Sequence, residues 1–172
     1  MKAFITVSLK LVIVISLASL MYACGVYSFT GASISPDIKS ISIQRFPNNA
    51  LLIEPTLSEK LTNEIRDKFS SETNLILLDK GGDLRMEGQI VGYKTQPVAI
   101  QANQTAALNR LSITIKVTFT NTKDPTMDYE STFTRYEDYP SSQNLASVQE
   151  TLIDQINEML VDDIFNKAVV NW

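Results

Sequence analysis

The chain has 172 residues, 44% of them hydrophobic and 20% charged, with one Cys, no His and a formal net charge of −4. This length accommodates one domain, and the absence of His excludes Ser-His-Asp and Cys-His catalysis and the common zinc and copper ligand sets. The composition therefore favours a non-enzymatic protein that needs no cofactor. Because nucleic-acid-binding proteins are usually basic, the negative net charge also indicates a protein that binds no nucleic acid.

The first 23 residues have the features of a secretory signal peptide. Lys2 and Lys10 supply a positive start, and residues 11–22 (LVIVISLASLMY) then form an uncharged apolar run. Twelve residues rise about 18 Å as a helix, which is too short for a hydrocarbon core of about 30 Å but suits a signal peptide. We therefore predict residues 1–23 to be a cleaved signal peptide.

Cys24 follows the small residue Ala23, as the lipidated Cys follows the signal of a bacterial lipoprotein. Met21 and Tyr22 depart from the usual residues before such a Cys, so an uncleaved anchor is the alternative. Acyl chains, at about 0.8 kcal/mol per buried CH₂, would hold the protein on a membrane. The residue after Cys24 is Gly25, whereas lipoproteins retained in the inner membrane carry an Asp at this position. By resemblance to sorted lipoproteins, Gly25 therefore favours the outer membrane.

Residues 24–38 are rich in Ser, Gly and small side chains, and we predict that they form the lipidated N-terminus and a tether. The domain is then expected over residues 39–172. Its predicted strands have alternating or continuous apolar residues, and its predicted helices repeat apolar residues every three to four positions. The predicted strands are 40–44, 75–78 (buried), 84–90, 111–119 and 128–139, and the predicted helices are 55–69 and 147 to the C-terminal region.

The two predicted helices differ in their signals. Leu57, Leu61, Ile65 and Phe69 form one apolar stripe on the first helix. Residues 147–150 (SVQE) have the form of a capping box and predict the start of the second. The element order β-α-β-β-β-β-α predicts a single two-layer α+β sandwich, with a four- to five-stranded, mostly antiparallel sheet and two helices packed on one face.

Three basic residues are candidates for binding an anionic glycolipid. Arg110 lies at the start of the 111–119 strand, Lys116 lies in its middle, and Arg135 lies on the next strand. Across a hairpin they could approach one another and hold phosphates. A row of Thr and Lys is also an ordinary solvated strand face or a protected edge, and the sequence leaves both interpretations open.

The segment 93–110 separates two strong strands and has few charges but many Gln, Asn and Ala. It could insert into a cavity of a partner protein without burying charges, or it could be an extended hairpin tip. No metal site is predicted. Asp162 and Asp163 would point about 100° apart on a helix, and the turn 79–83 lacks the ligand spacing of a calcium loop.

Five stretches of the chain resemble the LptE family of lipopolysaccharide-assembly lipoproteins, in a divergent branch. They are CGVYSFTGASISPDIKSISIQRFPN from Cys24 onward, PVAIQ, TAALNRLSITIKVTFTNTKDP, FTRYEDYPSS and VDDIFNKAVVNW. The resemblance covers essentially the whole chain after the signal peptide. Only the lipidated Cys is carried over by a matching motif, onto Cys24, and Arg110, Lys116 and Arg135 remain inferences from strand placement.

The resemblance implies a non-enzymatic lipoprotein anchored in the outer membrane and facing the periplasm. Members of this family plug the lumen of the LptD β-barrel, help it assemble and bind lipopolysaccharide. The implied partners are therefore an LptD-type barrel, lipopolysaccharide and the membrane. The alternative is a periplasm-facing regulatory lipoprotein that docks on a cell-wall enzyme or secretion complex, because fold alone does not fix function.

Overall fold

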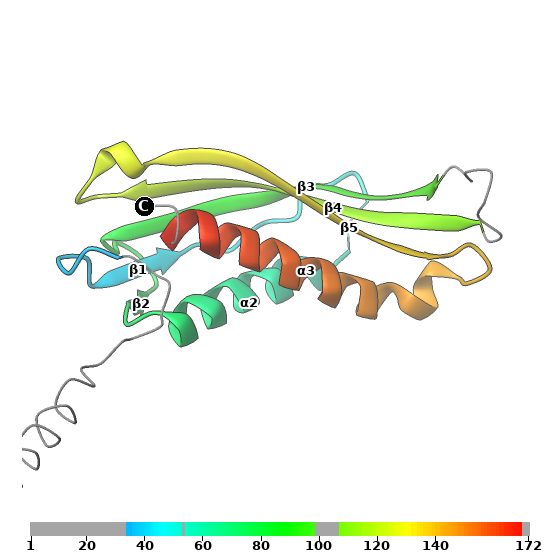
Figure 1. Ribbon diagram of the computed structural model, residues 1–172, viewed down its shortest axis with the longest axis horizontal. Helices are drawn as coiled ribbons and strands as arrows, with labels where there is room; N and C mark the ends of the chain where they lie inside the picture. The colour runs from blue at the N-terminus through cyan, green and yellow to red at the C-terminus, as the bar shows by residue number, and fades with distance from the viewer. Residues whose placement is uncertain (1–33, 53, 99–106, 170–172) are drawn as a thin grey trace, which may run out of the picture. The chain divides into compact units, whose positions relative to one another are not determined.

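The computed structural model describes residues 34–52, 54–98 and 107–169, and Figure 1 shows their arrangement. The predicted signal peptide, Cys24 and most of the predicted tether lie outside the described residues. The described elements are β1 (Ser40–Ile43), α2 (Leu57–Glu72), β2 (Ile76–Leu78), β3 (Leu84–Val98), β4 (Leu108–Asn121), the short 3-10 helix η1 (Pro125–Met127), β5 (Tyr129–Pro140) and α3 (Leu145–Val169).

The strands form one mixed sheet in the order β2-β1-β3-β4-β5. The long strands β3, β4 and β5 pair antiparallel along nearly their full length, whereas the short β1 is parallel to both of its neighbours. The chain returns from β1 to β2 through α2, and a crossover of this kind makes the two strands parallel. The predicted α+β fold with a mostly antiparallel sheet is confirmed.

Both helices cover the same face of the sheet and lie side by side (Figure 1). Lys60 pairs with Asp154, and Lys68 pairs with Asp162. Because both pairs have the same sequence offset, α2 and α3 run parallel to each other in a fixed register. The layer of two helices on one face agrees with the prediction.

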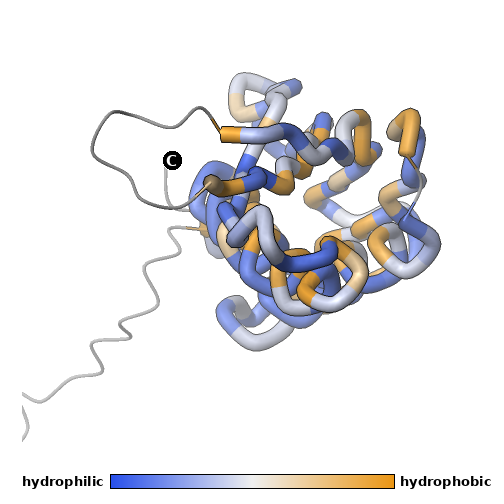
Figure 2. The backbone as a smooth tube through the Cα atoms, turned by 90° about the vertical axis from the view of Figure 1, so that its right-hand side faces the viewer, coloured by the Kyte–Doolittle hydropathy of each residue, from blue (hydrophilic) through white to orange (hydrophobic). Residues whose placement is uncertain are grey.

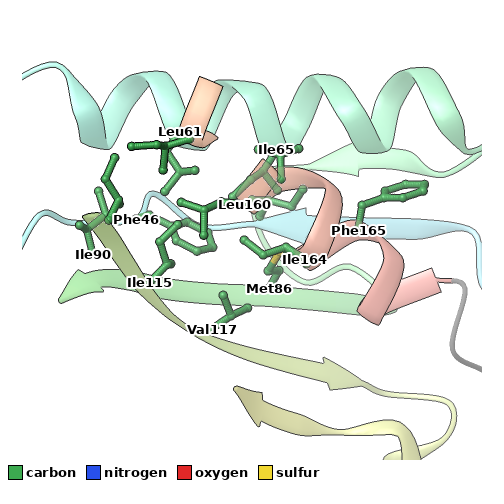
Figure 3. Packing of buried hydrophobic residues seen from close by; sticks show 14 of the residues in the cluster. Phe46, Leu61, Ile65, Met86, Ile90, Ile115, Val117, Leu160, Ile164 and Phe165 are labelled. Carbon is green, nitrogen blue, oxygen red and sulfur yellow. The ribbon is translucent and has the colours of Figure 1, made fainter. Parts of the chain in front are cut away.

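The core lies between the sheet and the helices. Alternate residues of β4 point to the helices and are buried, and the predicted stripe of α2 meets them together with one stripe of α3. Figure 3 shows Leu61 and Ile65 of α2 packed near Ile115 of β4 and Ile164 of α3. The two-residue period of the strand and the near-four-residue period of the helices therefore correctly identified most of the buried side chains.

Side chains of α2 also replace a missing strand beside β1. β2 pairs with β1 only as far as Ser42, and the backbone groups of Ile43 and Phe46 bond instead to side chains of α2. Ser58 Oγ donates to the Phe46 carbonyl oxygen at 2.6 Å, and Thr62 Oγ1 accepts from the Phe46 N–H at 3.1 Å. Arg66 Nη2 donates to the Ile43 carbonyl oxygen at 2.7 Å. Since buried backbone groups must be hydrogen-bonded, Ser58, Thr62 and Arg66 of α2 have a structural role here.

Three sequence-based expectations need correction or refinement. The 75–78 run does form a strand, but β2 lies at the sheet edge and its three side chains are exposed. The last helix begins at Leu145 rather than Ser147, because the Asn144 side chain accepts from the Ala146 N–H and starts the helix earlier. Much of segment 93–110 belongs to β3 and β4, as the hairpin interpretation requires, and residues 99–106 lie outside the described residues.

Candidate interaction surface

The face of the sheet opposite the helices is polar along its three long strands. We call it the open face. It consists of every second side chain of β4 and the cross-strand neighbours of those side chains on β3 and β5. Figure 2 shows hydrophilic and hydrophobic residues alternating along the strands. The open-face residues of β4 and β5 are Arg110, Ser112, Thr114, Lys116, Thr118 and Thr120, with Glu130, Thr132, Thr134, Tyr136 and Asp138.

Arg110 lies on the open face but is already paired. Its guanidinium donates to both carboxylate oxygens of Asp138, at 2.7 and 2.9 Å, and lies 3.6 Å from the centre of the Tyr136 ring. The hydrogen bonds from Arg110 hold the pKa of the Asp138 carboxyl below its usual value. A bidentate pair stacked on an aromatic ring fixes the arginine in place.

Lys116 lies on the same face and pairs with Glu130 at 2.8 Å. Its neighbours include Thr114, whose hydroxyl lies 3.0 Å from that of Thr134 on β5. Arg110 and Lys116 are six residues apart along one strand, which corresponds to about 20 Å. On β4 and β5 the open face therefore presents mainly hydroxyl groups, and these two cations are neutralised separately at distant points. On β3 it adds Arg85, Glu87 and Lys94, which form no ion pair among the described residues.

Arg135 lies on the other face of the sheet. Its register partner on β4 is Ile113, whose side chain is buried under the helices. The Arg135 guanidinium accordingly binds Asp163 of α3 through two hydrogen bonds of 2.6 Å. The structure does not bring Arg135 together with Arg110 and Lys116, because residues directly opposite in an antiparallel pair share one face.

The acidic residues of α3 connect neighbouring elements. Asp154 and Asp162 pair with Lys60 and Lys68 of α2, and Asp163 pairs with the sheet. The equal eight-residue spacing of the two lysines and of the two aspartates was the sequence signal for these contacts. Among the described residues no group of His, Cys, Asp or Glu is arranged to hold a metal ion.

The turn before β3 also has a structural role. The Asp83 carboxylate accepts hydrogen bonds from the N–H groups of Lys39 and Ser40 and from the Ser40 hydroxyl, at 2.9 to 3.2 Å. These bonds, led by that from Lys39, hold the pKa of Asp83 below its usual value. The carboxylate that could have suggested a calcium ligand instead ties the turn to β1.

Residues 38–168 match the family model LptE, described as lipopolysaccharide-assembly. The chain belongs to the LptE family. No curated protein matches its sequence. Within the described ranges, no helix combines the length and apolar character needed to cross a membrane.

Two solved structures share the fold of this LptE-family protein, and a third is similar to it in part, all at low sequence identity. A Xanthomonas campestris protein is 10% identical with a TM-score of 0.52, over 81% of this chain and 90% of its own. A putative neuraminyllactose-binding hemagglutinin homolog from Helicobacter pylori is 9% identical with a TM-score of 0.50, over 81% and 87%. The rare lipoprotein B from Shewanella oneidensis is 10% identical with a TM-score of 0.43, over 73% and 89%.

Proposed function

We propose that this LptE-family protein is an outer-membrane lipoprotein that plugs an LptD-type β-barrel and helps it assemble, and thereby supports lipopolysaccharide transport and insertion at the cell surface. The single observation that carries the proposal is the family match over residues 38–168. The protein acts by binding and has no catalytic step. It faces the periplasm and the barrel lumen.

The anchor in this proposal is Cys24, acylated after removal of residues 1–23. Residues 24–38 then connect the lipid to the domain at 39–172. Cys24 is the only Cys in the chain, so no disulfide competes for its thiol. Several acyl chains on one Cys give lasting membrane attachment, because one chain alone binds only marginally.

The chemistry of the open face supports placement against a barrel wall. Lumen walls of outer-membrane barrels are polar. Along β4 and β5, the hydroxyl groups can bond to such a wall without burying unpaired charge. The two open-face cations discussed above, Arg110 and Lys116, already have carboxylate partners. The alternative, a regulatory module docked on a cell-wall enzyme or secretion complex, is the competing outcome of the test.

Lipopolysaccharide contact at the open face would use Arg110 and Lys116. Each would have to exchange its carboxylate partner, Asp138 or Glu130, for a phosphate of the ligand. Arg135 is held on the opposite face by Asp163 and would not join them. We therefore propose local contacts with single phosphate groups at this face and no three-residue site.

The test is affinity purification of the tagged full chain from detergent-solubilised outer membranes, with Cys24→Ala and Ser28→Ala prepared in parallel. We expect the wild-type protein and Ser28→Ala to retain a stoichiometric large β-barrel in high salt. Cys24→Ala should lose outer-membrane placement and recover less barrel. Isolation of the wild-type protein alone, or with a peptidoglycan enzyme, would contradict the proposal and favour the docking alternative.

A further inference from the structure

A second group of cations lies away from the open face, where α2 passes the end of β1. Arg45 and Arg66 line one hollow of about 310 Å³ together with Glu59, Thr62 and Asn63. Pockets that bind small molecules have volumes of about 300–1,000 Å³. The hollow is thus large enough for a phosphate group and part of the molecule that carries it.

Hydrogen bonds to the fold hold both guanidinium groups in place. Arg66 donates from Nε and Nη2 to the Ile43 carbonyl oxygen, at 3.3 and 2.7 Å. Arg45 donates from Nε to Ser58 Oγ at 3.1 Å. These bonds leave Nη1 of Arg66 and both Nη atoms of Arg45 without a partner in the described part of the chain.

These two arginines differ from Arg110 and Arg135 in their electrostatic state. Arg110 and Arg135 are each neutralised by a bidentate carboxylate. Neither Arg45 nor Arg66 forms an ion pair with a carboxylate of the described residues, although Glu59 lines the same hollow. Two positioned and unneutralised guanidinium groups in one hollow form an arrangement suited to an oxyanion, since their planar N–H pairs match phosphate oxygens.

We infer that the hollow lined by Arg45 and Arg66 binds a phosphate group, and that the bound group belongs to a phosphorylated glycolipid. The free Nη donors of Arg45 contact the phosphate oxygens, and Arg66 adds a donor from the α2 side. Asn63 and Thr62 lie beside them as polar lining. Glu59 opposes the anion and limits its affinity. The identity of the ligand as lipopolysaccharide rests on the proposed function.

The experiment measures binding of purified lipopolysaccharide to the full-length lipidated protein in detergent, by surface plasmon resonance. The variants are Arg45→Gln, Arg45→Lys and Glu59→Gln. Arg85→Gln is the matched control, because Arg85 is an exposed arginine of β3 that also lacks a carboxylate ion pair among the described residues. Thermal unfolding by circular dichroism checks that each variant is folded.

We expect Arg45→Gln to weaken binding about tenfold or more, since a hydrogen bond to a charged group is lost. Arg45→Lys should give an intermediate loss of affinity, because the positive charge remains but the planar pair of guanidinium N–H donors is absent. Glu59→Gln should strengthen binding a few-fold, and Arg85→Gln should leave it unchanged. Removal of the phosphates from the lipopolysaccharide should abolish the difference between wild type and Arg45→Gln.

A folded Arg45→Gln variant with wild-type affinity would overturn the inference. So would equal losses in Arg45→Gln and Arg85→Gln, because these would indicate non-specific charge. Inorganic phosphate is titrated separately by ¹⁵N NMR. If the wild type binds inorganic phosphate at Arg45 but not lipopolysaccharide, the phosphate site stands and its glycolipid source is rejected. Loss of barrel co-purification with binding intact would reject the proposed function alone, and binding of neither ligand would reject the site.

Discussion

The two faces of the β3–β4–β5 sheet come from the same stretches of sequence but have different physical roles. On β4, Ile115 is completely buried under the helices, whereas its neighbour Lys116 lies on the open face with Glu130. The covered face stabilises the domain through apolar burial. The open face contributes little to stability and leaves hydroxyl groups available to a partner. Alternate residues of each strand thus belong to the stabilising core and to the proposed interaction surface.

The largest effect is expected from a substitution on the covered face. Ile115→Ala should lower the free energy of unfolding by about 2–5 kcal/mol, because it removes buried methylene groups and leaves a cavity. Thr118→Ala, three residues along on the open face, should change it by about 0.5 kcal/mol or less. Urea denaturation followed by circular dichroism measures both. Equal losses from the two variants would contradict the division of roles.

A smaller loss is expected where α2 closes the side of β1. Thr62→Val keeps the side-chain shape but removes the hydroxyl that accepts from the Phe46 N–H and donates to the Ser58 carbonyl oxygen. The buried Phe46 N–H is left without a hydrogen-bond partner, so the free energy of unfolding should fall by about 1–3 kcal/mol. Thr118→Val on the exposed open face is the control. Unchanged stability of Thr62→Val would show that this side of β1 does not depend on the helix.

The smallest effect is expected for the Arg110–Asp138 pair on the open face. Asp138→Asn should cost at most about 1 kcal/mol at pH 7, since the pair is partly solvated. Arg110 holds the folded-state pKa of Asp138 below the ordinary value of 3.8. The pair therefore stabilises the fold fully at pH values above 3.8, and this stabilisation is lost as the pH falls through the lower folded-state pKa of Asp138.

Unfolding curves of wild type and Asp138→Asn at pH 7 and at pH 2–3 test this linkage. The stability difference should be present at pH 7 and should shrink in acid. A difference that stays constant with pH would show that the carboxylate charge is not responsible.

Patterns within single elements predicted most of this architecture. The alternation in β4 and the stripe Leu57, Leu61, Ile65 and Phe69 are local features, and the structure buries them as expected. The exposure of β2 was not predictable in the same way. The four consecutive aliphatic residues 75–78 indicate a strand, but whether that strand lies in the middle or at the edge of the sheet depends on its neighbours.

The candidate site was predicted less completely, for a related reason. The two-residue period of β5 places Arg135 on the same strand face as Tyr129 and Phe133, and the structure shows that the helices cover this face. No pattern within the strand indicated that Asp163 of α3 would be its partner. Arg45 and Arg66 come from different elements, and only the packing of α2 beside β1 brings them to one hollow. Sites made from several elements require the tertiary structure.

The most direct test of the central claim is photo-crosslinking in living cells from the open face. A photoreactive amino acid is placed at Thr118 or at Thr132, which lie on adjacent strands with their side chains on that face. The account predicts an ultraviolet-dependent adduct with a large outer-membrane β-barrel from both positions. A folded, membrane-bound protein that gives no barrel adduct from either position would contradict the claim that the open face rests against the barrel.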